Sequence, residues 1–72
     1  MVVNFLENRI KEFREKKGIS QGQLADLCGV SRQTINAIEN NKYDPSLQLA
    51  FNLAKTLSIT VDHLFLSEGD VE

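Results

Sequence analysis

Apolar residues recur at helical spacing in two short segments near the middle of the chain. In the first segment, Leu24, Ala25 and Cys28 stand at i, i+1 and i+4, which places them on one face of a helix. In the second segment, Ile35 and Ile38 stand three residues apart and also share a face. The pattern predicts two short helices, each of which buries one face and exposes the other.

Capping residues mark where these two helices begin and end. Ser20 precedes the first helix, and Gln23 completes a capping-box pattern three residues later. Gly29 stands where the end of a helix favours a residue with positive φ, and Ser31 can cap the second helix. The caps therefore predict a tight turn between the two helices.

The exposed face of the second helix, the recognition helix, is polar and has its first acidic residue only at its end. It carries Arg32, Gln33, Thr34, Asn36 and Asn40. In the major groove of DNA, arginine pairs with the edge of guanine and glutamine with the edge of adenine. Such a face is typical of a helix that reads DNA, although an ordinary helical hairpin with a solvated polar face would show a similar pattern.

Apolar spacing predicts three supporting helices. Leu6, Ile10 and Phe13 indicate a first helix that starts near residue 4 or 8 and ends at residue 17. Beyond the loop that contains Pro45, Ser46 can cap a fourth helix over residues 47–57, and Thr60 a short fifth one. In the fourth helix the residues expected to face inward are Leu47, Ala50, Phe51, Ala54 and Leu57. In the fifth helix the apolar residues are Val61, Leu64 and Phe65.

The two ends of the chain are more apolar than a small monomer requires. Val2, Val3 and Phe5 lie near the start, and the fifth helix is followed by Leu66. One interpretation folds both ends back onto the domain as a short strand pair. The other places Leu64 and Leu66 in a two-fold interface between copies of the chain.

The central segment resembles the helix-turn-helix of the lambda repressor/Cro-like (XRE) family of regulators. Counted from Gln21, Ala25 is the fifth residue, Gly29 the ninth, Ile35 the fifteenth and Ile38 the eighteenth, and apolar residues fill the fourth, eighth and tenth positions. The resemblance covers about residues 10–65. It implies an all-α, five-helix DNA-binding domain with the helix-turn-helix at its second and third helices. The chain is expected to be one domain over residues 1–72, with a core over 8–66 and an acidic tail over 67–72.

The resemblance and the residue chemistry together assign roles along the motif. Base reading is expected from Arg32, Gln33 and Asn36. Phosphate contacts are expected from Gln21, Ser31, Thr34, Asn40, Asn41, Lys42 and Tyr43. In the family, the glutamine at the place of Gln21 also braces a residue of the recognition helix. Thr34 could instead be only a solvated helix residue, and Tyr43 could cover the edge of the core.

The net charge of −2 is low for a DNA-binding protein, which is usually basic. The last six residues hold three acids and no base, so the remaining chain has eight bases against seven acids. Lys11, Arg14, Lys16 and Lys17 form a cluster that suits either a solvated helix end or phosphate contacts. The modest charge argues for few phosphate contacts per subunit, and therefore for a homodimer that doubles them.

Several classes of function find no support in the sequence. His63 is the single histidine, and no cluster of residues has the spacing of a metal site or of a catalytic pair. The single cysteine, Cys28, lies on an apolar face and is expected in the core. We therefore expect no enzyme, no cofactor, no metal and no evident small-molecule ligand. The chain shows neither a membrane span nor a signal peptide, so a cytoplasmic location is expected.

Two functions remain in competition. The first is sequence-specific binding of double-stranded DNA by a homodimer on a palindromic operator, as a transcriptional regulator and most plausibly a repressor. The second is a protein-interaction module on the same fold, such as an antitoxin-type partner or a coregulator. The polar face of the recognition helix favours the first, and the net negative charge leaves room for the second.

Overall fold

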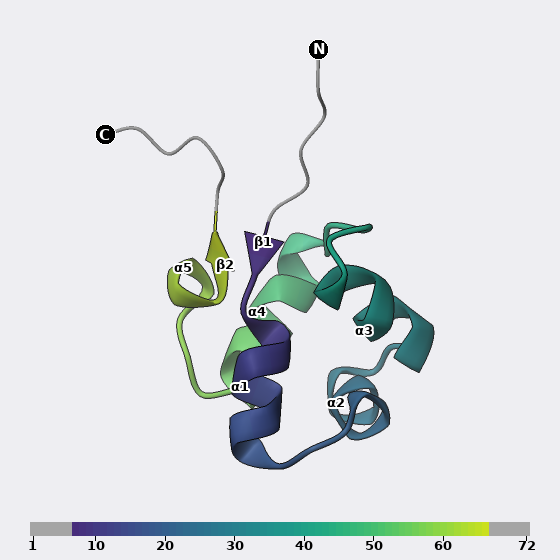
Figure 1. Cartoon of the computed structure of the whole chain (residues 1–72). Coiled ribbons are helices and arrows are strands. Elements are labelled where there is room, and N and C mark those ends of the chain that lie inside the picture. The colour runs from purple at the N-terminus through teal and green to yellow at the C-terminus, as the bar shows by residue number, and fades with distance from the viewer. Residues whose placement is uncertain (1–6, 67–72) are drawn as a thin grey trace, which may run out of the picture.

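The computed structural model of the chain describes residues 7–66, which form five helices and one two-stranded antiparallel sheet. In chain order the elements are β1 (Glu7–Asn8), α1 (Ile10–Lys17), α2 (Gln21–Cys28), α3 (Arg32–Glu39), α4 (Leu47–Thr56), α5 (Val61–Leu64) and β2 (Phe65–Leu66). Figure 1 shows the helices gathered around a common centre, with β1 and β2 side by side at one end. The predicted all-α fold of five helices is confirmed.

Three serine side chains cap the N-termini of helices, as predicted. Ser20 accepts a hydrogen bond from the backbone nitrogen of Gln23 at 3.0 Å, and its own nitrogen donates to Gln23 Oε1 at 2.8 Å, which completes the capping box. Ser31 caps α3, and Ser46 caps α4, each by accepting from a backbone nitrogen at 3.1 Å. Thr60 stands at the N-cap of α5 but makes no side-chain cap bond. Its hydroxyl is instead hydrogen-bonded to His63 Nδ1 at 2.8 Å.

Left-handed residues end four of the helices. Gly18 and Gly29 follow α1 and α2 with φ of 73° and 72°, and the positive φ of Gly29 was predicted from its position in the sequence. Two non-glycine residues take the same conformation, Asn41 after α3 and Ser58 after α4, each with φ of 59°. This conformation costs an L-residue roughly 1–2 kcal/mol relative to right-handed backbone. The ends of α3 and α4 are therefore the more strained ones.

Replacing Ser58 with glycine should raise the free energy of unfolding by about 0.5–1 kcal/mol. Glycine has no Cβ penalty at φ of 59°, and this gain exceeds the extra entropy that glycine gives to the unfolded chain. Urea denaturation followed by circular dichroism measures the change. The control is Lys55→Gly. Lys55 is exposed and lies within α4, where glycine should lower the free energy of unfolding by about 1 kcal/mol. A loss of stability in Ser58→Gly would contradict the prediction.

The core brings together apolar side chains from all five helices. Its largest fully buried members are Ile10, Leu24, Ile35, Ile38, Leu53 and Leu64. Cys28 is buried as predicted, and its Sγ lies 3.7 Å from Thr56 Oγ1 on α4. Phe65 is also buried, which agrees with its expected place in the core. No helix within residues 7–66 has both the length and the apolar character to span a membrane.

The predicted inward face of α4 was partly wrong. Leu47 is 71 % exposed and Phe51 is 49 % exposed, whereas Leu49 and Leu53 are buried. The helix has apolar residues on more than one side, so two overlapping faces fit the sequence. Ala50, Ala54 and Leu57 are buried as predicted, and the observed face adds Leu49 and Leu53 to them. Leu47 and Phe51 consequently lie on the solvent side.

The strand pair is formed by residues other than those at the extreme ends. Glu7 pairs with Leu66, and Asn8 pairs with Phe65, in antiparallel register. Val2, Val3, Phe5 and the predicted acidic tail over residues 67–72 lie outside the described residues. The placement of Leu64 in a dimer interface needs correction, because its side chain is fully buried in the core of its own chain. Leu66 is half-buried and retains accessible surface.

Candidate nucleic-acid interface

The outer face of α3 is held in place by its buried inner face. Ile35 and Ile38 are 0 % and 1 % exposed, and they anchor α3 in the core. Ala25 of α2 is also buried, as expected for a small residue at the crossing of α2 and α3. The opposite face of α3 presents Arg32, Gln33 and Asn36 to solvent. The predicted base-reading residues are therefore exposed on one rigidly supported helix.

Three shallow depressions surround this face. The first is lined by Gln21, Arg32, Gln33 and Asn36. The second is lined by Ser31, Gln33, Thr34, Ala37, Lys42 and Tyr43. The third is lined by Arg14, Ser20, Gln21, Gly22 and Arg32. The structure thus brings the three predicted base readers together with Gln21, and it places Lys42 and Tyr43 beside the recognition helix.

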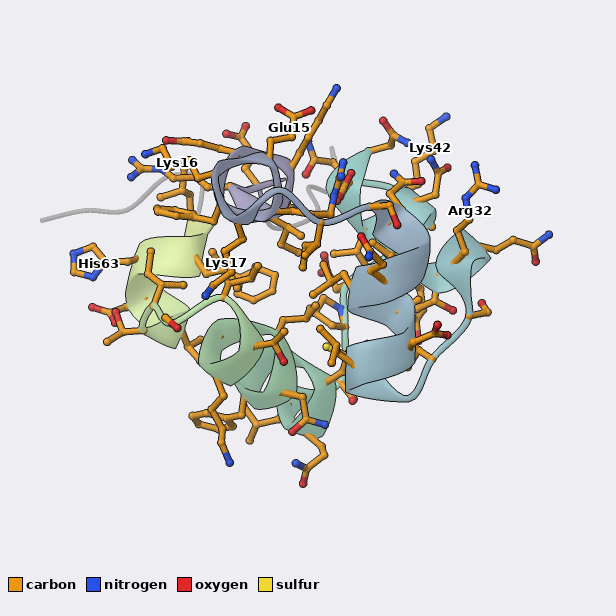
Figure 2. All side chains as sticks on the ribbon, turned by 90° about the horizontal axis from the view of Figure 1, so that it is seen from below. Glu15, Lys16, Lys17, Arg32, Lys42 and His63 are labelled. Atoms are coloured by element: carbon orange, nitrogen blue, oxygen red, sulfur yellow. The ribbon has the colours of Figure 1, made fainter. Side chains whose placement is uncertain are left out.

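Figure 2 shows two cations at this end of the molecule, Arg32 and Lys42, both projecting outward. His63 lies at the opposite end, on α5. Lys16 and Lys17 lie apart from Arg32 and Lys42. Lys16 pairs with Glu12 at 3.4 Å and lies 5.1 Å from the ring centroid of Phe13. This placement favours the interpretation of these lysines as a solvated helix end.

Several predicted phosphate-binding side chains already make local hydrogen bonds. The hydroxyls of Ser31 and Thr34 lie 2.9 Å apart, and Thr34 is half-buried. Asn40 Nδ2 donates to the carbonyl oxygen of Asn36 at 2.9 Å and to its Oδ1 at 3.3 Å. The second bond uses Asn36 Oδ1 as its acceptor, and the Asn36 side chain as a whole is exposed. Tyr43 is 50 % exposed and so does not cover the core edge completely.

A buried ion pair joins α1 to α3 beneath the depressions. Arg14 Nε lies 2.7 Å from Glu39 Oε2, and Arg14 Nη2 lies 3.3 Å from Glu39 Oε1. Arg14 Nη1 also donates to the carbonyl oxygen of Ile19 at 3.0 Å. The hydrogen bond to Glu39 raises the pKa of the Arg14 guanidinium, against the opposing effect of burial. Arg14 is only 8 % exposed, so the prediction that groups it with solvated or phosphate-binding bases is wrong.

Gln21 extends this network to α2. Its Nε2 donates to Glu39 Oε1 at 2.9 Å, so the glutamine braces a residue of the recognition helix, as the family resemblance implies. The Glu39 carboxylate therefore contacts side chains from two other helices. A sequence signal for Arg14 did exist, because Ile10 and Arg14 stand at i and i+4 and hence share the buried face of α1.

Asp62 and His63, both on α5, do not form a catalytic pair. Hydrogen bonding by the Thr60 side chain lowers the pKa of Asp62, and so does the backbone nitrogen of Asp62 itself. The group is fully exposed, and His63 is occupied with Thr60 Oγ1. Within residues 7–66, no three histidine, cysteine, aspartate or glutamate side chains gather where a metal could bind.

Comparison with protein families gives a match over residues 10–64 to the helix-turn-helix family. An uncharacterised helix-turn-helix-type transcriptional regulator of Methanocaldococcus jannaschii is 46 % identical over 65 residues, which cover 90 % of this chain and 98 % of that protein. The uncharacterised regulator YgzD of Bacillus subtilis is 41 % identical over 65 residues, with the same shares of the two chains. These relatives are named as regulators of transcription and not as enzymes.

Solved structures similar to this chain include two regulators in complex with DNA. The P22 c2 repressor in complex with a synthetic operator is 34 % identical and has a TM-score of 0.77, over 86 % of this chain and 91 % of that one. SinR in complex with DNA is 35 % identical and has a TM-score of 0.69, over 74 % of this chain and 86 % of that one. The chain therefore belongs to the lambda repressor-like helix-turn-helix family of DNA-binding transcriptional regulators.

Proposed function

We propose that this protein binds a specific double-stranded DNA operator as a homodimer and represses transcription from the promoter that the operator overlaps. The observation that carries the proposal is the exposed depression lined by Gln21, Arg32, Gln33 and Asn36 on the outer face of α3. These side chains offer several hydrogen-bond donors and no carboxylate to a groove whose walls are negatively charged.

Arg32 and Gln33 are the principal base readers in this proposal. Both are exposed residues of the first turn of α3, the part of a recognition helix that meets base edges in helix-turn-helix proteins. Each bidentate pair with a base provides about 1–3 kcal/mol of discrimination. Asn36 stands one turn further along and lines the same depression.

In this proposal, side chains on both sides of the base readers contact the phosphates of the DNA. Lys42 and Tyr43 line one depression beside α3, and Gln21 lines another at the start of α2. The proposed phosphate contacts are Gln21, Ser31, Thr34, Asn40, Asn41, Lys42 and Tyr43. Ser31 Oγ already accepts from the Thr34 nitrogen and shares a hydrogen bond with Thr34 Oγ1, so a phosphate contact would be the third bond of the Ser31 hydroxyl and the second of the Thr34 hydroxyl.

The small number of cations on this face and the two-fold symmetry of an inverted repeat both favour a homodimer. Two cations, Arg32 and Lys42, project from this face of one copy, and a second copy would double the phosphate contacts. A two-fold dimer presents its recognition helices about 34 Å apart, one turn of DNA, and so matches an inverted repeat. The similarity to the P22 c2 repressor, solved in complex with an operator, supports the same mode of binding. Leu66 is the candidate interface residue that retains accessible surface.

Selection of duplexes from a randomised DNA pool tests base reading directly. The wild type should enrich an inverted repeat. Arg32→Ala and Gln33→Ala should each weaken binding to the enriched duplex by about 30-fold or more, because each loses a base contact of about 1–3 kcal/mol in both protomers of the homodimer. Both should bind a scrambled duplex nearly as well as the wild type does. Fluorescence anisotropy at two fixed salt concentrations measures these affinities.

Controls on α4 separate base reading from changes in charge or side-chain size. Lys55→Ala removes one positive charge as Arg32→Ala does, and Gln48→Ala truncates an exposed glutamine as Gln33→Ala does. Neither control should change specificity. Unchanged specificity in both α3 variants would refute the base-reading assignment, and a monomer in sedimentation at micromolar concentration would refute the homodimer. Failure to enrich any sequence would favour the alternative of a protein-interaction module.

A further inference from the structure

Asn8 connects the strand pair and the start of α1 to the end of α3, which is distant in the sequence. Its Nδ2 donates to the carbonyl oxygen of Ile38, in the last turn of α3, at 2.7 Å and to Asn41 Oδ1 at 3.2 Å. Its Oδ1 accepts from the backbone nitrogen of Ile10, the first residue of α1, at 3.1 Å. The backbone of Asn8 belongs to β1 and is paired with Phe65 of β2. One half-buried side chain thus joins the strand pair, α1 and the end of the recognition helix.

α3 ends in a turn whose backbone is strained, because the left-handed residue of the turn is not glycine. The nitrogen of Asn41 donates to the carbonyl oxygen of Ile38 at 3.0 Å, and the nitrogen of Lys42 donates to that of Ala37 at 2.9 Å. These two bonds form a Schellman turn, whose left-handed residue is most often glycine. Here that residue is Asn41, with φ of 59°. Asn8 donates hydrogen bonds to both the Ile38 carbonyl and the Asn41 side chain, and these two bonds stabilise the turn.

The turn determines where the next two residues stand. Lys42 and Tyr43 follow it directly and line a depression together with Ser31, Gln33 and Thr34 of the recognition helix. Rotation of the Asn41 backbone would therefore move Lys42 relative to the face that reads DNA. Residues on the two sides of a DNA groove must keep fixed spacing to contact base edges and phosphates at once.

We infer that Asn8 is a positioning residue for DNA binding, which acts through Asn41 to hold Lys42 and Tyr43 where they contact the DNA backbone. This inference rests on the proposed function, in which Lys42 and Tyr43 meet phosphates. Asn8 itself is placed at the strand pair and the start of α1, and its effect on DNA passes through the turn that ends α3.

The test replaces Asn8 and measures binding to the duplex that the wild type enriches. Asn8→Ala should weaken that binding about three- to tenfold, as expected for the loss of hydrogen bonds that hold a contact in place. The slope of log K against log salt should fall in magnitude by about 0.9 for each protomer in which the Lys42 contact is lost. Exchange of the backbone amide hydrogens of Asn41 and Lys42 with solvent should become faster in the free protein.

Two further variants make the test specific. Asn52→Ala truncates an asparagine of α4 that bonds to Gln48 at 3.2 Å, so it loses a side-chain bond within α4 instead of one to the turn and should bind as the wild type does. Asn8→Asp retains the oxygen that accepts from Ile10 but places a second oxygen against the Ile38 carbonyl and Asn41 Oδ1. It should keep the start of α1 intact and still show the loss of affinity and the faster exchange, even if Asn8→Ala folds poorly.

The outcomes distinguish this inference from the proposed function. All affinities are compared at a temperature where circular dichroism shows each variant to be fully folded. If the wild type enriches no duplex, the proposed function fails and the inference fails with it. If the wild type binds its duplex while folded Asn8→Ala and Asn8→Asp match Asn52→Ala in affinity and salt slope, the inference alone is overturned.

Discussion

Replacing Glu39 with alanine is expected to lower the free energy of unfolding by about 3–5 kcal/mol. The Arg14–Glu39 pair is nearly inaccessible to solvent, with side-chain exposures of 10 % and 3 %. Removing the carboxylate leaves the Arg14 guanidinium buried without its counter-ion and leaves Gln21 Nε2 without its acceptor. A core of this size supplies only about 3–5 kcal/mol in total. Most of the Glu39→Ala protein should therefore be unfolded at room temperature, which circular dichroism will detect.

Two comparisons separate the loss of a buried charge partner from the loss of any ion pair. Glu12→Ala removes the exposed Glu12–Lys16 pair and should cost no more than about 0.5 kcal/mol. The double variant Arg14→Met with Glu39→Met removes both buried charges, and it should be more stable than either single variant. Equal effects of Glu39→Ala and Glu12→Ala on the urea midpoint would contradict the prediction.

The Arg14–Glu39 pair also lies next to the proposed DNA interface, because its carboxylate bonds to Gln21. Glu39 lies at the end of α3, and it is bonded to Arg14 of α1 and to Gln21 of α2. Gln21 in turn lines the same depression as the base readers. The network therefore links α2 to α3 beside the residues that we propose to contact DNA.

Local signals made the helix-turn-helix predictable from the sequence. A capping serine acts on a backbone nitrogen three residues away, and the left-handed glycine acts on the turn that contains it. Ser20, Gly29 and Ser31 therefore fix the ends of α2 and α3 without help from distant parts of the chain. The exposed residues Arg32, Gln33 and Asn36 then follow from helical periodicity alone, given the buried Ile35 and Ile38.

Features that depend on distant residues could not be predicted in this way. The spacing of Ile10 and Arg14 indicates that Arg14 faces inward, but no local signal points to its partner Glu39, which is 25 residues away. Asn8 has no local sequence signal that points to Asn41, from which it is separated by 33 residues. Leu64 is as apolar as Leu66, and only the packing of α5 shows that the first is buried and the second partly accessible. In each case the tertiary contact decides the role of the residue.

The orientation of α4 illustrates the same limit and provides a sharp test. Leu53 is fully buried, whereas Phe51, two residues earlier, is 49 % exposed. Leu53→Ala should therefore lower the free energy of unfolding by about 2–5 kcal/mol, because it removes buried surface and leaves a cavity. Phe51→Ala removes more atoms but should cost less than about 1 kcal/mol, because the ring is already half in water. Urea denaturation of the two variants measures the difference. A larger loss in Phe51→Ala than in Leu53→Ala would show that α4 packs with the face that the sequence first indicated.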